Sequence, residues 1–95
     1  MNAITRENLI YHELIGLEAS VLSSPNSGYL GIKGKVIDET KGTLLISDDP
    51  KRKRVPKSAA VFRLTLPDGS IVEVDGRYLI GTPIERIKMV GRKSL

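Results

Sequence analysis

Residues 31–47 constrain the fold more than any other stretch of this sequence. Two apolar runs flank a polar turn at residues 38–42, as in a β-hairpin, and Gly42 can take the positive φ that closes a short loop. Gly31 and Gly34 interrupt the first strand, and glycines inside a strand mark a bulge, a sharp bend or a close approach of two backbones. The stretch therefore predicts a hairpin with a strongly bent first strand, which a small β-barrel needs in order to turn a corner.

The rest of the chain adds short strands separated by turn residues. Apolar and polar residues alternate over residues 17–22, 60–66 and 71–75, and Phe62 is expected in the core. Residues 67–69, Pro-Asp-Gly, form a turn signature between the last two strands. Together these patterns predict a mainly β fold, a small and strongly bent antiparallel barrel of the Sm-like or SH3-like kind.

Short helices are expected at both ends of the chain. Thr5 is a good N-cap and Gly16 a good helix end, and the apolar residues between them recur at roughly helical spacing. Residues 82–85, Thr-Pro-Ile-Glu, have the form of a capping box with Pro at the first helical position, and they open a short helix or turn ending at Met89. The whole chain is predicted to be one domain, residues 1–95, with residues 1–4 and 90–95 flexible.

The apolar stripe of the first helix is larger than a helix of this length needs for its own docking. Its residues are therefore predicted to close the barrel and to contact a protein partner. They are Leu9, Ile10, Leu14 and Ile15.

Charge is distributed unevenly along the chain. Residues 1–50 carry four Lys or Arg against seven Asp or Glu, whereas residues 51–95 carry eleven against four. Five of the ten residues 48–57 are basic, and because two prolines bracket them this segment is predicted to be a loop. A clustered basic half indicates a polyanionic partner, and nucleic acid is the commonest one. A merely solvated loop and a localisation signal are the alternatives.

Basic side chains in and around this segment are predicted to bind RNA phosphates, with a gain from counterion release. The predicted RNA-binding residues are Lys33, Lys35, Lys51, Arg52, Lys53, Arg54, Lys57, Arg77, Arg86 and Lys88. Because the chain has only three Tyr, one Phe and no Trp, recognition of backbone and shape is favoured over base stacking.

The sequence supplies little for catalysis or metal binding. It has no Cys, which suits a cytosolic protein, and its one His has no obvious catalytic partner. The carboxylate pairs Asp38-Glu39 and Asp48-Asp49 lie at turns, where acidic residues bond to the backbone, so turn chemistry is favoured over a metal site. No catalytic residue, cofactor or metal ligand is predicted on this chain. With no apolar run of membrane-spanning length and no signal-peptide core, a cytoplasmic location is expected.

Seven short motifs occur along the chain in a fixed order. They are His12-Glu13-Leu14-Ile15-Gly16-Leu17, Gly31-Ile32-Lys33-Gly34, Asp38-Glu39-Thr40, Thr43-Leu44, Val55-Pro56-Lys57, Val74-Asp75-Gly76 and Pro83 with Glu85-Arg86. In this combination the chain resembles archaeal ribonuclease P protein component 1 over nearly its whole length. It departs from the family pattern at Thr82 and Ile84, where the family often has Arg and an acidic residue.

The resemblance implies an Sm-like barrel that binds the RNA of ribonuclease P, a tRNA-processing ribonucleoprotein. It implies that this RNA, with magnesium ions, removes 5′ leader sequences from precursor tRNA, while the protein supports it without a catalytic site of its own. The implied partners are ribonuclease P RNA, the zinc-ribbon protein subunit, the other ribonuclease P proteins and, as substrate of the holoenzyme, precursor tRNA. On the residues alone, the alternative is a stand-alone Sm-like or SH3-like nucleic-acid-binding protein of ribosomal or chromatin type.

Overall fold

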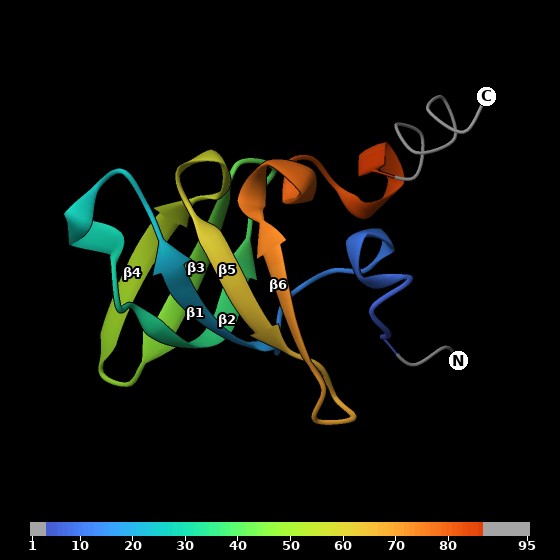
Figure 1. Cartoon of the computed structure of the whole chain (residues 1–95), viewed down its shortest axis with the longest axis horizontal. Coiled ribbons are helices and arrows are strands. Elements are labelled where there is room, and N and C mark those ends of the chain that lie inside the picture. The colour runs from blue at the N-terminus through green and yellow to red at the C-terminus, as the bar shows by residue number, and fades with distance from the viewer. Residues whose placement is uncertain (1–3, 87–95) are drawn as a thin grey trace.

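A computed structural model describes residues 4–86 of the chain, and a six-stranded antiparallel sheet dominates them (Figure 1). The strands are β1 (Glu18–Ser23), β2 (Lys33–Glu39), β3 (Thr43–Asp48), β4 (Lys51–Pro56), β5 (Val61–Thr65) and β6 (Ile71–Asp75). Short 3-10 helices connect or precede them: η1 (Leu9–Tyr11), η2 (Ser27–Tyr29), η3 (Lys57–Ala59) and η4 (Gly76–Leu79). Residues 83–86 are helical. The prediction of a mainly β fold is confirmed.

The strands lie in the order β4-β3-β2-β1-β5-β6. Three hairpins, β2–β3, β3–β4 and β5–β6, are joined by β1, which pairs with both β2 and β5. Among the described residues the sheet is open, because β4 and β6 are its two edges and do not pair with each other. The sheet is strongly curled, as Figure 1 shows.

The bend in the first strand of the β2–β3 hairpin has the predicted cause. Gly34 has a φ of +148°, and a Cβ on it would lie 2.0 Å from the carbonyl oxygen of Ser47 on the neighbouring strand. The register then shifts between Val36 and Asp38, which is a β-bulge that adds local twist. The role predicted for Gly42 is wrong, because its φ is not positive. Hydrogen bonds between Thr40 and Thr43 hold this turn instead.

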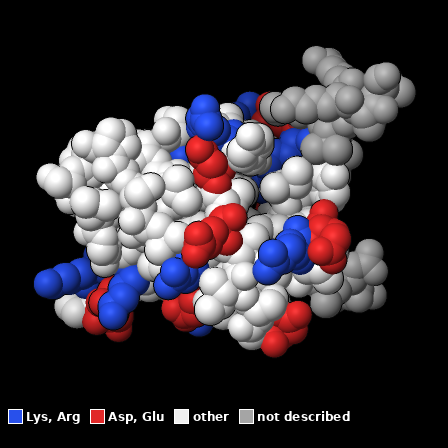
Figure 2. Space-filling view, viewed as in Figure 1, with Lys and Arg blue, Asp and Glu red and all other residues white. Residues whose placement is uncertain are grey.

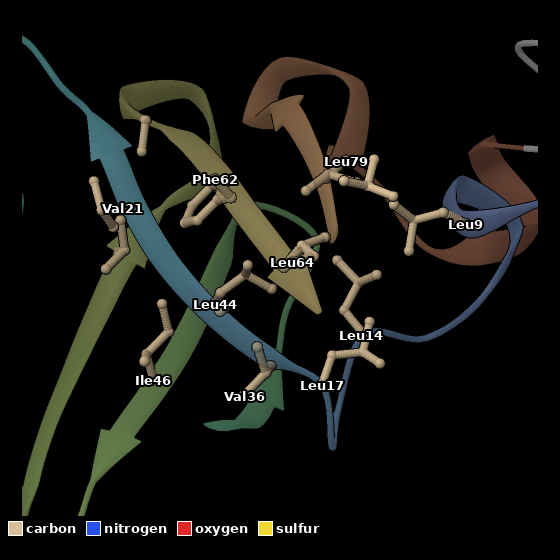
Figure 3. Close-up of a cluster of buried hydrophobic side chains, with 14 of the residues drawn as sticks. Leu9, Leu14, Leu17, Val21, Val36, Leu44, Ile46, Phe62, Leu64 and Leu79 are labelled. Carbon is tan, nitrogen blue, oxygen red and sulfur yellow. The ribbon is translucent and has the colours of Figure 1, made fainter. Parts of the chain in front are cut away.

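The core lies on one face of the curled sheet. Strand alternation places Phe62 and Leu64 on this face, both fully buried, and Leu44 and Ile46 approach from the other side (Figure 3). Burying each side chain of this size stabilises the fold by about 1.5–3 kcal/mol. Leu9 and Leu14, from the N-terminal segment, complete the core at the end where Leu79 lies.

The predicted N-terminal helix is wrong except for one short turn. The Thr5 hydroxyl oxygen accepts a hydrogen bond from the Asn8 backbone N–H, but this bond lies in the turn before η1. Only Leu9–Tyr11 is helical, and its N-cap is Asn8. The backbone that follows bonds to distant side chains, because Leu14 donates to Glu39 and the carbonyl of His12 accepts from Arg86. Tertiary hydrogen bonds therefore replace the ladder that a helix of this length would need.

Most of the basic segment 48–57 is a strand rather than the predicted loop, because β4 covers Lys51–Pro56. Six residues of β4 pair with β3, and the chain reverses at residues 49 and 50. The prediction is wrong because neither proline interrupts the strand. Pro50 lies in the turn before β4, and Pro56 is the last residue of this edge strand, where proline is tolerated. Exposed Lys and Arg are also typical of edge strands, since they discourage pairing with other chains.

The predicted capping box at Thr82 is confirmed. The Thr82 hydroxyl oxygen accepts from the Glu85 backbone N–H at 3.2 Å, and the Glu85 carboxylate accepts from the Thr82 backbone N–H at 2.9 Å. The remainder of the predicted helix after Arg86, the RNA-binding residue Lys88 and the predicted flexible residues 1–3 and 90–95 lie outside the described residues. In the part of the chain that is described, no helix has the length and apolarity to cross a membrane.

Candidate functional site

Three charged side chains meet in the interior of the protein. Glu39, at the end of β2, accepts hydrogen bonds at the same carboxylate oxygen from Lys57 Nζ at 2.8 Å and from Arg86 Nη1 at 3.1 Å. Its other oxygen accepts from the Leu14 backbone N–H at 2.8 Å. The side chains of Glu39, Lys57 and Arg86 are 7%, 0% and 2% exposed, so water screens this cluster little.

Arg86 joins the two ends of the described chain through the same cluster. Its guanidinium donates to the carbonyl oxygens of Leu79 at 2.7 Å and Gly81 at 2.8 Å, next to the C-terminal helix. It also donates to the carbonyl oxygens of Ile10 and His12, in the N-terminal segment. The N-terminal segment and the C-terminal helix therefore lie beside each other at one end of the molecule (Figure 1).

Two opposing effects act on the pKa of Lys57 in this cluster. Burial lowers the pKa of its ammonium below the ordinary value, while the hydrogen bond and the charge of Glu39 act in the opposite direction. The ammonium also donates to the carbonyl oxygens of Lys41 and Gly81. Among the described residues, no buried side-chain nitrogen or oxygen lacks a hydrogen-bond partner. The cluster is thus fully satisfied from within the protein.

The structure places two of the predicted RNA-binding residues in this cluster. Lys57 and Arg86 are buried and hold Glu39, so neither side chain can reach a phosphate outside the protein. Of the four residues predicted to close the barrel and to contact a partner, Leu9 and Leu14 are buried in the core. Ile10 is partly buried, and Ile15 is 48% exposed.

The exposed cations gather on the edge strand β4. Lys51, Arg52, Lys53 and Arg54 are all exposed. Because Val55 is buried opposite Leu44, strand alternation places Lys51 and Lys53 along the face that continues from the core. Arg52 and Arg54 lie along the outer face, and Figure 2 shows Lys and Arg gathered at the β3–β4 end of the molecule, with acidic side chains beside them.

Two cations of β2 extend this basic surface. Lys33 and Lys35 are both exposed. Lys35 is opposite Ser47, and Ser47 is opposite Arg52, so Lys35 and Arg52 lie in one row on the outer face. Arg54 is partly neutralised, since its guanidinium lies 3.5 Å from the Asp38 carboxylate.

Arg77 lies away from this surface, on η4 beside the opposite sheet edge β6. Its guanidinium pairs with Asp75 at 3.1 Å, and this hydrogen bond raises the pKa of Arg77. The Asp75 carboxylate also accepts from the backbone N–H of Arg77, which lowers the pKa of Asp75 and caps η4. The pair therefore serves backbone geometry, and the structure does not bring Arg77 together with β4.

A groove lies between the basic strand and the loop that contains η2. Its volume is about 540 Å³, and it is lined by Gly28, Gly31, Ile32, Lys33, Ile46, Asp48, Lys51, Arg52 and Lys53. The ammonium of Lys53 lies 5.7 Å from the centre of the Tyr29 ring, a cation–π contact. No local sequence pattern indicates this groove, because β2, β3, β4 and the loop with η2 all contribute to its lining.

Glu39 was also missed as a structural residue, since a carboxylate after a strand was assigned to turn chemistry. A useful signal was present, because Glu39, Lys57 and Arg86 each belong to one of the short ordered motifs of the sequence. Within residues 4–86, no group of three or more His, Cys, Asp or Glu side chains could hold a metal ion.

The fold and the surface together define a small antiparallel β protein that presents a basic edge strand. This is the class that binds polyanions through surface cations. The family model described as Ribonuclease P/MRP, subunit p29 matches residues 7–89, so the chain belongs to this family, as the resemblance in its motifs predicted.

Similar proteins agree with the family. The chain is 47% identical over 91 residues to ribonuclease P protein component 1 of Methanothermobacter thermautotrophicus, covering 95% of this chain and 98% of that protein. It is 49% identical over 86 residues to the protein of the same name from Methanocaldococcus jannaschii, covering 90% of each. A solved structure of a homologue of human RNase P protein Rpp29 superposes with a TM-score of 0.58 at 47% identity, covering 79% of this chain and 97% of that one.

Proposed function

We propose that this chain is the RNA-binding protein subunit of ribonuclease P, which supports the catalytic RNA in removing 5′ leader sequences from precursor tRNA. The observation that carries the proposal is the family match over residues 7–89, with relatives named ribonuclease P protein component 1. The chain takes part in an endoribonuclease as one component of a holoenzyme. Its own contribution is to bind, and the exposed cations of β4 are the side chains suited to that task.

A protein subunit that binds RNA contributes positive charge close to the RNA phosphates. A folded RNA brings phosphates close together, and their mutual repulsion must be offset by bound cations. Lys51, Arg52, Lys53 and the neighbouring Lys33 and Lys35 offer several positive charges on one end of the sheet. We therefore expect the protein to lower the magnesium concentration that the catalytic RNA requires, with the magnesium bound by the RNA and no cofactor bound by this chain.

In this role the curled sheet serves as an Sm-like barrel, and the chain works as one RNA-binding domain in the cytoplasm. The close contact at Gly34 and the bulge after Val36 support the barrel, because such bends let a small sheet curl back on itself. The proposed partners are the ribonuclease P RNA, the zinc-ribbon subunit, the other protein subunits and precursor tRNA bound by the holoenzyme. Exposed apolar residues near both chain ends, Ile15 and Ile84, suit a protein partner.

Copurification from native cells tests the assignment. Affinity-purified protein should carry ribonuclease P RNA, whereas an enrichment of ribosomal RNA instead would support the stand-alone alternative.

Reconstitution tests whether the RNA carries out the cleavage while the protein supports it. The purified protein alone should not cleave precursor tRNA, and adding it with its partner subunits to the cognate RNA should lower the magnesium concentration at half-maximal cleavage. Metal-dependent 5′ cleavage by protein freed of all RNA would overturn the proposal.

A further inference from the structure

The groove beside β4 combines an apolar surface with positive charge, whereas binding a phosphate alone requires only the charge. Ile32 and Ile46 give it an apolar floor, Ile32 being only partly buried and able to contact a ligand. Four cations, Lys33, Lys51, Arg52 and Lys53, line the groove against one carboxylate, that of Asp48, so its charge is positive on balance. A ligand that fits the groove must therefore carry an apolar, flat or compact part together with a negative charge.

The position of Lys53 strengthens this conclusion. Strand alternation places Lys51 and Lys53 on the face that leads into the core, so their ammonium groups border the groove rather than point away from the sheet. The Tyr29 ring lies 5.7 Å from the Lys53 ammonium and keeps that long side chain at the groove wall. Lys53 is thus held at the groove, whereas Arg54 bonds Thr43 and Asp38 on the outer face.

We propose that this groove binds one unpaired nucleotide of RNA, with the base over Ile32 and the adjoining phosphates at Lys51 and Lys53. The proposal rests on the proposed function and deepens it, because it names what part of the RNA the basic edge recognises. A paired base is stacked within its helix and cannot reach the apolar floor, whereas a bulged or looped base can leave the stack. The groove volume of about 540 Å³ lies in the range of ligand sites.

Three short RNA hairpins that share one stem sequence distinguish the contribution of the base to binding from that of the phosphates. One is fully paired, one carries a single unpaired adenosine, and one carries an abasic residue at the same place. Binding of the intact protein is measured by fluorescence anisotropy over a series of salt concentrations. The unpaired adenosine should raise affinity by roughly fivefold or more over the abasic hairpin, because the two differ only in the base.

Protein variants locate the base and the phosphates. Ile32→Ser should remove the preference for the base while leaving the salt dependence of binding unchanged, and Ile32→Val, which keeps the apolar floor, should retain the preference. Lys51→Gln with Lys53→Gln should weaken binding of all three hairpins and lower the salt slope. Arg54→Gln, a cation of the same strand outside the groove, should leave the base preference intact.

A second readout does not depend on any variant folding. With 2-aminopurine as the unpaired base, binding to the unmodified protein should increase the fluorescence, because the base leaves its stacked neighbours for an aliphatic floor. Equal affinity for the adenosine and abasic hairpins, with a steep salt slope, would overturn the nucleotide site and leave the proposed function standing. Failure of all three hairpins and of the ribonuclease P RNA itself to bind would overturn both.

Discussion

Glu39 links three separate parts of the chain through one carboxylate. It holds Lys57 from the start of η3, Arg86 from the C-terminal helix and the Leu14 backbone from the N-terminal segment. Buried charges are costly to desolvate, and removing one partner leaves the others without compensation. The burial of two cations around one acid therefore makes Glu39 the member whose loss leaves the largest uncompensated charge.

Glu39→Gln should lower the free energy of unfolding by about 3–5 kcal/mol, because Lys57 and Arg86 would then share a buried site without a counter-charge. Chemical denaturation monitored by circular dichroism measures the change. Glu73→Gln is the matched control, since Glu73 pairs with Arg63 in an exposed ion pair whose loss should cost at most about 1 kcal/mol. Equal losses of unfolding free energy in the two variants would show that the buried cluster stabilises the fold no more than an exposed ion pair does.

The lowered pKa of Lys57 makes its contribution depend on pH. Between the lowered pKa of the folded protein and the ordinary value of 10.5, the unfolded chain binds more protons than the folded one. Stability from this residue therefore rises as pH increases through that window. The difference in unfolding free energy between the protein and Lys57→Met should grow in favour of the protein as pH is raised towards 10.5. A constant or shrinking difference would show that burial does not lower this pKa.

At the scale of elements, β4 differs from an ordinary half-buried strand because only Val55 is buried while its first four residues are exposed cations. The strand is held by six pairings to β3 on one side, and within residues 4–86 no strand pairs with its other side. Its backbone position therefore depends on β3, and its cations can change without loss of core packing.

Replacing Lys51, Arg52 and Lys53 by Gln should leave the thermal unfolding temperature nearly unchanged and weaken binding to ribonuclease P RNA. Removing one cation that binds a phosphate should reduce the slope of log affinity against log salt by somewhat less than one unit. Arg54→Gln alone should have a smaller effect, since its charge is already shared with Asp38. Arg63→Gln, on β5 and paired with Glu73, serves as a control for general charge. An unchanged salt slope in the triple variant would show that these residues do not bind RNA phosphates and only form a solvated surface.

Local sequence rules predicted the elements that local interactions determine. The bend at Gly34 and the capping box at Thr82 depend on residues close in sequence or on one strand neighbour, and both are predicted correctly. The predicted N-terminal helix and basic loop are wrong because distant partners decide those segments: Arg86 and Glu39 bind the backbone of the first, and β3 pairs with the second. The positive charge of Lys57 is evident from the sequence, but its burial depends on Glu39, eighteen residues earlier.

At the scale of the whole molecule, the two proposed binding surfaces lie at opposite ends. The β3–β4 hairpin and η2 occupy one end, whereas the N-terminal segment and the C-terminal helix occupy the other (Figure 1). The second end carries exposed Ile15 and Ile84, and Ile15 and Pro83 line a hollow of about 330 Å³. One end therefore suits RNA and the other a protein, so a single small subunit can hold both at once.

Ile15→Asp and Ile84→Asp should each weaken binding to the zinc-ribbon subunit by tenfold or more, the order of magnitude expected when an apolar anchor is removed from an interface. Both side chains are exposed in the isolated chain, at 48% and 66%, so the variants should fold with little loss of stability. Leu30→Asp is the matched control, because Leu30 is also 48% exposed but follows η2 at the opposite end. Leu9→Asp should instead unfold the protein, since Leu9 belongs to the core. Isothermal titration with the purified partner measures the affinities, with thermal unfolding as the check on folding. If Leu30→Asp weakens binding while Ile15→Asp and Ile84→Asp do not, the protein partner occupies the η2 end, and it would then compete with RNA for the basic edge.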